Sequence, residues 1–193
     1  MADEQFAGLS DKELLAEIIK GRGDLFALLY DRHAAAVYRH ILFRCAEEAI
    51  AEDVSSQAFL QIWEHVREGK KIASFRAFLF QTARNIFIDQ TRKREFKNLS
   101  LEAIVDEKDK EPVGTDNLLE EAAVNDEVRA LQSALATIPE DYREIITLRY
   151  LNELSITEIA KVTGKNSGAI YVSLHRGIRL LRKALVDALP FQP

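Results

Sequence analysis

One basic segment of the sequence carries side chains well suited to nucleic acid. Residues 161–183, KVTGKNSGAIYVSLHRGIRLLRK, contain six Lys or Arg and no acid, although the formal net charge of the chain is −5. Cations and polar groups on one helix face can contact phosphates and the base edges of the major groove. The alternative is a basic face that meets only solvent, but a helix of that kind normally pairs its cations with acids. The segment therefore favours DNA binding.

A second segment, SFRAFLFQTARNIFIDQTRKREF at residues 74–96, combines aromatic, polar and cationic side chains. The apolar residues of this segment repeat at helical spacing and predict one buried face. The opposite, outer face of the predicted helix presents Arg84. Phe80 lies at the border of that outer face, and Asn85 and Arg92 lie on its flank. An aromatic ring can stack on any unpaired base while arginine holds the backbone, so this face suits single-stranded DNA. Completion of the core edge by Phe80 is an equally good interpretation.

A third segment, AEDVSSQAFLQIWEHV at residues 51–66, has the apolar spacing of a helix, but one of its apolar residues lies outside the predicted buried stripe. Its predicted buried stripe leaves Leu60 outside, among Asp53, Gln57 and Glu64. An exposed apolar side chain in a mildly acidic surround is a candidate contact for another protein. A single surface leucine also occurs without any function, so the segment alone supports only a weak hypothesis.

These segments belong to a chain that is predicted to be all-α. Apolar spacing of three and four runs through most of the sequence, and Gly and Pro are sparse and concentrated at boundaries. The longest break lies near residues 98–127, where ten acids and two lysines stand between Glu102 and Glu127. The prediction is two small helical domains, residues 1–96 and 127–193, joined by an acidic linker at residues 97–126.

The C-terminal domain has the plan of a helix-turn-helix. A short helix is predicted to end at Gly164, and Asn166 or Ser167 can cap the long helix that follows. At about 100° per residue, an apolar stripe starts at Ile170 and the basic face lies opposite. The second helix of such a motif enters the major groove. The residues predicted to contact DNA there are Lys165, Asn166, Ser167, Tyr171, Val172, His175, Arg176 and Arg179.

Several other classes of function are not favoured by the sequence. The chain has one cysteine, Cys45, and four scattered histidines, so no intrachain disulfide and no metal-ligand spacing are expected. No apolar run is long enough to span a bilayer, and the acidic N-terminus lacks the plan of a signal peptide. We expect no cofactor, no membrane insertion and a cytoplasmic location.

Taken together, the sequence resembles the small, two-domain bacterial sigma factors of the extracytoplasmic-function group. The resemblance covers nearly the whole chain and depends on the order and spacing of its parts. These are SDKELLAEIIKGRGDLFALLYDRHAAAVYRHI, AEDVSSQAFLQIW, SFRAFLFQTARNIFIDQTRKR and LQSALATIPEDYREIITLRYLNELSITEIAKVTG with its following helix.

The resemblance implies that the first domain binds core RNA polymerase and melts the downstream promoter element, while the second binds the upstream element. Asp53, Gln57, Leu60 and Glu64 would then dock on the polymerase. The downstream element would be contacted by Phe80, Arg84, Asn85 and Arg92. An anti-sigma protein is a further implied partner, although no residue of the sequence identifies one. The chain departs from the common family pattern at Ser56 and Gln57, and again at residues 171–173.

Two rival functions remain open at this point. A one-component repressor or activator would use the same helix-turn-helix without binding polymerase, but such proteins usually dimerise, and the sequence shows no spare long apolar helix. A DNA-processing enzyme such as a recombinase would need a nucleophile or clustered carboxylates. No such constellation is visible, so we expect that the protein is not an enzyme.

Overall fold

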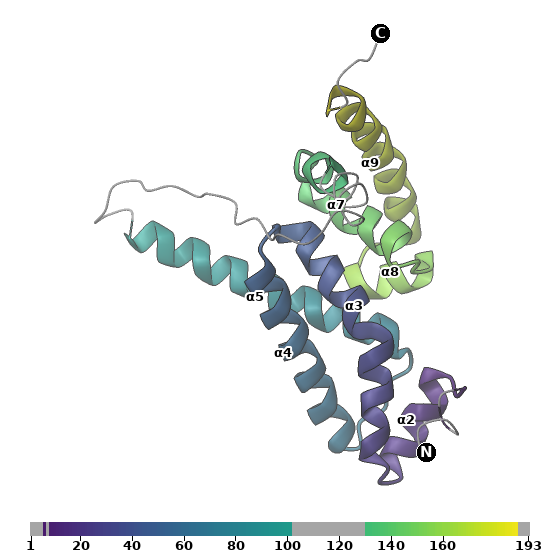
Figure 1. Cartoon of the computed structure of the whole chain (residues 1–193). Coiled ribbons are helices and arrows are strands. Elements are labelled where there is room, and N and C mark those ends of the chain that lie inside the picture. Colours follow the sequence, from purple (N-terminus) through teal and green to yellow (C-terminus); the bar gives the residue numbers. More distant parts are fainter. Residues whose placement is uncertain (1–5, 7, 102–129, 189–193) are drawn as a thin grey trace, which may run out of the picture.

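The structure is a computed structural model of the 193-residue chain that describes residues 6, 8–101 and 130–188. All regular elements of this described part are helical, as the sequence predicts. They form an N-terminal and a C-terminal unit (Figure 1). The N-terminal unit consists of α2 (Asp11–Ile19), η1 (Gly23–Leu25), α3 (Phe26–Cys45), α4 (Glu48–Arg67) and α5 (Phe75–Leu101).

The core of the N-terminal unit lies between α3, α4 and α5, with α2 packed at one end (Figure 1). A capping box begins α2, since Ser10 and Glu13 bond each other's backbone amides. The side chains of Leu14, Leu29, Ile41 and Ile62 are fully buried. The predicted stripe of α4 is buried too, and comprises Ala51, Val54, Ser55, Ala58, Ile62 and Val66.

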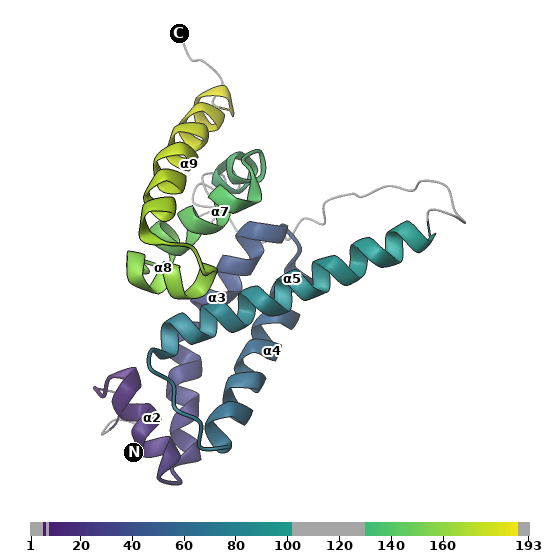
Figure 2. The ribbon, with the colours of Figure 1, turned by 180° about the vertical axis from the view of Figure 1, so that it is seen from behind.

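Helix α5 is longer than the sequence predicts. Ser74 caps it through its hydroxyl, which accepts the Ala77 amide at 3.4 Å. The helix continues to Leu101 rather than ending near residue 96. Its 27 residues span about 40 Å, so its C-terminal half projects beyond the bundle in both views (Figures 1 and 2). The predicted linker thus begins inside α5, and its residues from 102 onward lie outside the described part of the chain.

The C-terminal unit contains the predicted helix-turn-helix. Residues 130–136 are helical, and α7 (Glu140–Ile146) starts after Pro139. The segment then widens into a π-helix, η2 (Thr147–Leu151). Helix α8 (Ile156–Thr163) and helix α9 (Ser167–Ala188) follow.

The N-terminal and C-terminal units pack against each other. Helix α8 packs against α5, while α7 and η2 pack against α3. One buried cluster contains Ile41 and Leu79 of the N-terminal unit together with Leu148 and Ile159 of the C-terminal unit. The C-terminal unit therefore covers one side of α3 and α5 (Figure 2).

Candidate nucleic-acid and protein interfaces

The turn between α8 and α9 is fixed by its own backbone and caps. Ser155 and Glu158 form a capping box at the start of α8. Gly164 ends that helix with φ of 71°, in the left-handed region that glycine adopts without strain. The Asn166 side chain then accepts the Ala169 amide at 2.9 Å and caps α9. Of the two predicted caps, Asn166 forms this bond, and the turn sets the angle at which α9 leaves α8.

The start of α9 presents the predicted DNA-reading face to solvent. Tyr171 is 61% exposed and Val172 is 50% exposed, while Ile170 on the opposite side is fully buried. Asn166, Ser167, His175, Arg176 and Arg179 are exposed as well. Lys165 is half-buried and pairs with Asp141 at 3.0 Å. The structure thus brings all eight predicted upstream-element residues to the turn and to the first thirteen residues of α9.

A groove of about 670 Å³ adjoins this face. Side chains of η2 form one wall, and Arg149 is held there because its Nη1 donates to the Leu154 carbonyl at 2.8 Å. No acid is among the residues that line the groove. They are Arg149, Tyr150, Ile156, Tyr171, Leu174, His175, Ile178, Arg179 and Arg182. Sequence reasoning missed Arg149 and Tyr150, although the basic and aromatic pair in "LRYL" was a signal that could have drawn attention to them.

The predicted single-strand face of α5 is mostly covered in this structure. Phe80 is fully buried, with its ring edge-on to His40 at 5.3 Å between centroids. The prediction that Phe80 lies at an outer border is therefore wrong, because the side of α5 that faces α3 and the C-terminal unit is also packed. Arg84 lies in the interface between the units, with its side chain 22% exposed. Asn85 and Arg92 are exposed, as predicted.

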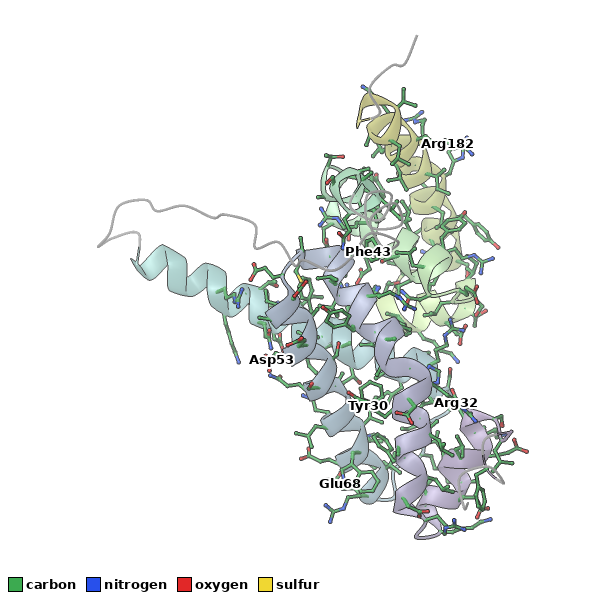
Figure 3. The ribbon with its side chains drawn as sticks, viewed as in Figure 1. Tyr30, Arg32, Phe43, Asp53, Glu68 and Arg182 are labelled. Atoms are coloured by element: carbon green, nitrogen blue, oxygen red, sulfur yellow. The ribbon has the colours of Figure 1, made fainter. Side chains whose placement is uncertain are left out.

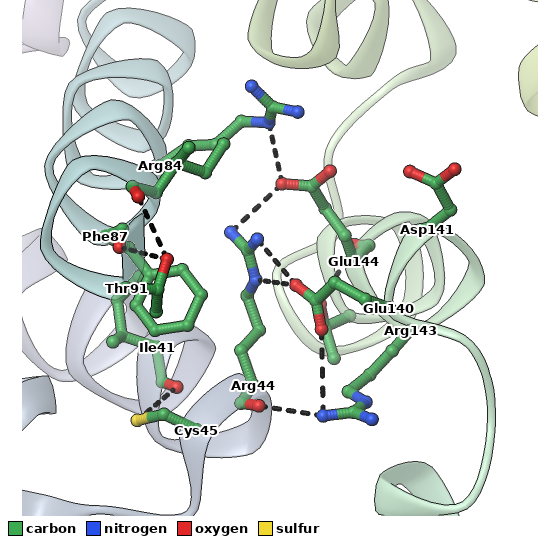
Figure 4. A network of polar contacts seen from close by, with 12 residues as sticks. Ile41, Arg44, Cys45, Arg84, Phe87, Thr91, Glu140, Asp141, Arg143 and Glu144 are labelled. Atoms are coloured by element: carbon green, nitrogen blue, oxygen red, sulfur yellow. Dashed lines mark hydrogen bonds and ion pairs between the residues drawn. The ribbon is translucent and has the colours of Figure 1, made fainter. Parts of the chain in front are cut away.

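A network of charged side chains joins the two units where α3, α5 and α7 meet (Figure 4). The Glu144 carboxylate accepts Arg84 Nε at 2.8 Å, and Arg44 Nη1 lies 3.0 Å from the same oxygen. Arg44 also donates to Glu140 from Nε, at 2.7 Å. The side chains of Arg44 and Glu144 are each only 2% exposed. The Arg143 Nη1 donates a hydrogen bond to the backbone carbonyl of Arg44 at 2.8 Å.

His40 lies beside this network and is fully buried. Its Nδ1 is 3.2 Å from the Thr147 hydroxyl and 3.3 Å from the Asn152 amide nitrogen, both of the C-terminal unit. Burial lowers the pKa of His40 well below its ordinary value, and the nearby cations Arg44 and Arg84 lower it further. The imidazole is therefore neutral at pH 7.

The outer face of α4 carries the predicted protein-docking residues. Leu60 is 56% exposed, and Glu64 beside it is exposed too. Asp53 accepts the Gln57 side-chain amide at 2.9 Å and the Gln90 amide of α5 at 2.7 Å, so its carboxylate is fixed in place. Asp53 on this face and Arg182 of α9 lie on widely separated parts of the molecule (Figure 3). The α4 face and the α9 face can thus contact different partners at once.

The described residues also bear on metal binding and on membrane insertion. No group of three or more metal-binding side chains occurs among them. None of the helices described is both long enough and apolar enough to cross a membrane.

Two separate stretches of the chain match models of regions of the same protein family. Residues 29–96 match the family model "Sigma-70 region 2", and residues 128–181 match "Sigma-70, region 4". The chain is 33% identical to the ECF RNA polymerase sigma factor BldN of Streptomyces coelicolor over 190 residues, covering 92% of this chain and 68% of that protein. It is also 33% identical to the ECF RNA polymerase sigma factor SigL of Mycobacterium tuberculosis over 170 residues, covering 84% and 90%.

The fold has a counterpart among solved structures. CnrH, solved in complex with the cytosolic domain of CnrY, superimposes with a TM-score of 0.68 at 23% sequence identity. The alignment covers 93% of this chain and 99% of CnrH. At that identity the likeness concerns the fold alone.

Proposed function

This chain belongs to the extracytoplasmic-function (ECF) group of RNA polymerase sigma factors, and we propose that it binds core RNA polymerase and directs initiation through two promoter contacts. The observation that carries this proposal is the exposed basic face of α9, held by a capped turn. Such a face fits the major groove of duplex DNA. The other two parts of the function are contact with the downstream promoter element, which we assign to α5, and docking on the polymerase, which we assign to the face of α4 that carries the exposed Leu60.

For the upstream element, we assign base reading to the exposed start of α9. Val172 can contact a thymine methyl group, and Arg176 is well placed for a guanine edge. Arg149 and Arg182 line the adjoining groove and can hold phosphates. The remaining proposed contacts are Lys165, Asn166, Ser167, Tyr171, His175 and Arg179.

For the downstream element, we assign Arg84, Asn85 and Arg92 of α5. Melting a promoter leaves unpaired bases that must be held by side chains, because unstacking costs a few kcal/mol. Asn85 and Arg92 are exposed, whereas the Arg84 side chain is 22% exposed and donates from Nε to Glu144 at 2.8 Å. Phe80 is not part of this assignment, since it is fully buried.

For polymerase docking, we assign Asp53, Gln57, Leu60 and Glu64 on α4. Leu60 offers an exposed apolar contact in an acidic surround, which is the composition of a small interface centre with a polar rim. The protein contributes binding and positioning, with no chemical step of its own. We place it with the polymerase in the cytoplasm, and we propose an anti-sigma protein as a further partner.

The test is transcription by purified core RNA polymerase on a library of randomised promoters, with and without this protein. The DNA upstream of each transcript is then sequenced. We expect initiation that depends on the protein and selects two spaced motifs. An Arg176→Ala variant should alter the upstream motif and leave the downstream motif unchanged.

The opposite result also has a clear meaning. Unchanged transcription by the core enzyme, together with no stable complex between the protein and core polymerase, would contradict the proposal. Binding to paired half-sites without polymerase would then support a one-component DNA-binding regulator.

A further inference from the structure

The groove between η2 and α9 carries an excess of positive charge. Arg149, Arg179 and Arg182 are among its lining residues, and no acid is. On α9, Arg176, Arg179 and Arg182 follow one another at intervals of three residues, a spacing at which like charges repel. None of these three is in an ion pair within the described part of the chain. The groove and the exposed side of α9 therefore attract an anionic occupant.

The floor of the groove is apolar. Leu174 is buried there, Ile156 and Ile178 are half-buried, and the rings of Tyr150 and Tyr171 are exposed beside them. A phosphate can pair with the arginines, but it leaves this apolar surface in contact with water. A segment that carries aliphatic side chains next to carboxylates can contact both parts of the groove at once. The groove is thus best matched by an acidic and partly apolar stretch of polypeptide.

One stretch of this chain has that composition. Residues 116–127, DNLLEEAAVNDE, contain five acids and no base, together with two leucines, two alanines and a valine. We call these residues the acidic segment. The stretch before it, residues 102–115, also holds five acids, but it includes two lysines and no leucine. The acidic segment is therefore the better match to the groove in charge and in apolar character.

The acidic segment is joined directly to the unit that carries the groove. It ends at Glu127, only four residues before Leu131. Leu131 belongs to an apolar cluster with Ile178 of α9, and Ile178 also lines the groove. Because a chain spans at most about 3.6 Å per residue, Glu127 lies within about 15 Å of Leu131. A tether that short gives the segment an effective concentration on the order of millimolar at the groove.

We propose that the acidic segment, residues 116–127, binds in the groove between η2 and α9 of the free protein and competes there with the phosphates of duplex DNA. Its carboxylates pair with the groove arginines, and its leucines contact the apolar floor. The inference rests on the proposed function, because it takes α9 and the groove as the surface for the upstream element. The apparent affinity for duplex falls in proportion to the fraction of chains whose groove is empty.

This competition acts mainly against DNA that is not a promoter. Non-specific binding comes almost entirely from contacts with phosphates, and the phosphate contacts assigned to Arg149 and Arg182 are the ones that the acidic segment takes. The base contacts assigned to Val172 and Arg176 add free energy only at a preferred sequence. A preferred duplex can therefore displace the segment where a random duplex does not.

Two matched variants of the full chain test the proposal, and each removes five acids. The segment variant combines Asp116→Asn, Glu120→Gln, Glu121→Gln, Asp126→Asn and Glu127→Gln. The control variant makes the same kind of change in residues 102–115, with Glu102→Gln, Asp106→Asn, Glu107→Gln, Asp109→Asn and Glu111→Gln. Both variants gain the same net charge, so a difference between them reports position and not charge alone. Circular dichroism confirms that each is folded.

The first measurement is the anisotropy of a fluorescent duplex of random sequence, titrated at several salt concentrations. We expect the segment variant to bind the duplex about tenfold more tightly than the parent chain at low salt. The gain should shrink as salt rises, because salt screens the carboxylates and the phosphates alike. The control variant should bind like the parent chain to within about twofold, since its acids lie farther along the chain from the groove.

The second measurement locates the acidic segment without DNA. A nitroxide label is attached at Asn117→Cys in a Cys45→Ala background, and the amide signals of residues 174–182 are followed by NMR. We expect these signals to be broadened in the labelled chain. They should recover when the five charges of the segment are removed, and also when duplex DNA is added.

Three results would overturn the proposal. An equal gain in duplex binding by both variants would mean that net charge alone governs the affinity. Unbroadened signals in the labelled chain would mean that the groove is empty. Broadening that requires the label and the observed amides to be on different molecules would place the segment of a second copy in the groove. Failure of the proposed function is recognised separately, since Arg176→Ala would then leave duplex binding unchanged while the broadening persisted.

Discussion

Gly177 of α9 lies so close to Ile146 of α7 that no larger residue fits between them. A Cβ atom at position 177 would stand 2.8 Å from the Ile146 Cδ1 and 3.0 Å from the Tyr142 Cβ. The latter atom is next to the backbone and cannot swing away. This close approach sets the distance between α9 and α7, and hence the position of the DNA-reading face over the rest of the C-terminal unit.

Gly177→Ala should therefore destabilise the protein despite the better helix propensity of alanine. Overpacking of this kind costs about 1 to 3 kcal/mol, against a propensity gain of about 1 kcal/mol. Urea unfolding followed by circular dichroism measures the difference. Gly168→Ala is the control, because the nearest atom to its added Cβ is the end of the Asn166 side chain at 3.4 Å. Equal loss in both variants would contradict the packing argument.

Arg176 and the arginines of the groove should affect DNA binding in different ways. Arg176→Ala is expected to weaken binding to the preferred upstream element by about 1 to 3 kcal/mol and to relax sequence preference. Arg149→Ala and Arg182→Ala should weaken binding to all duplexes alike and reduce the salt slope by about one each. Titrations of a preferred and a scrambled duplex at several salt concentrations test this. A sequence-specific effect of Arg149→Ala would contradict the phosphate assignment.

Leu60→Ala should weaken binding to core polymerase while leaving the fold intact. The side chain is 56% exposed, so its loss removes little from the core of the free protein. At the centre of an interface the same truncation costs about 1 to 2 kcal/mol, or roughly tenfold in affinity. Pull-down and titration with labelled core enzyme provide the measurement. Ile19→Ala, at another exposed apolar side chain on α2, is the control, and an equal effect there would rule out a specific role for Leu60.

Acidification should weaken the contact between the two units through His40. Because burial holds the pKa of His40 well below 6.5, the unfolded chain takes up a proton that the folded chain resists. Stability from the neutral imidazole is fully present above pH 6.5 and is lost as the pH falls below it, at about 1.4 kcal/mol per pH unit. The protonated ring would face Arg44 and Arg84, with Glu144 already paired to both.

Urea unfolding between pH 7.5 and pH 5 tests this prediction at His40. His40→Asn keeps a polar atom near the Nδ1 position but cannot take up a proton in this range. The variant should be less stable at pH 7 and should lose the part of the pH slope that His40 supplies. An unchanged slope in the variant would show that other groups account for the acid sensitivity.

Much of the fold was predictable because it depends on local signals. The spacing of apolar residues predicted the helices, Asn166 was one of the two residues predicted to cap α9, and Gly164 predicted the end of α8. The exposed residues of α9 were predicted from the same periodicity, since a helix that packs on one side leaves the other side to solvent. Leu60 was predicted to be exposed for that reason also.

The errors lie where distant segments meet. Phe80 and Arg84 were placed on an outer face of α5 because no periodic signal shows that a second unit will pack there. Arg44 and Glu140 pair across 96 positions of sequence, a distance at which spacing carries no information. The groove wall at Arg149 depends on the π-helix, which shifts the helix face by about one residue relative to a regular α-helix.

The exposed face of α9 and the partly covered face of α5 offer unequal surfaces to DNA in this structure. A duplex along the start of α9 would meet Tyr171 and Val172 with no change in the packing of the helices. On α5 the exposed side chains are Asn85 and Arg92, while Arg84 is bonded to Glu144 and only 22% exposed. The chain therefore presents a larger open surface to double-stranded DNA than to a separated strand.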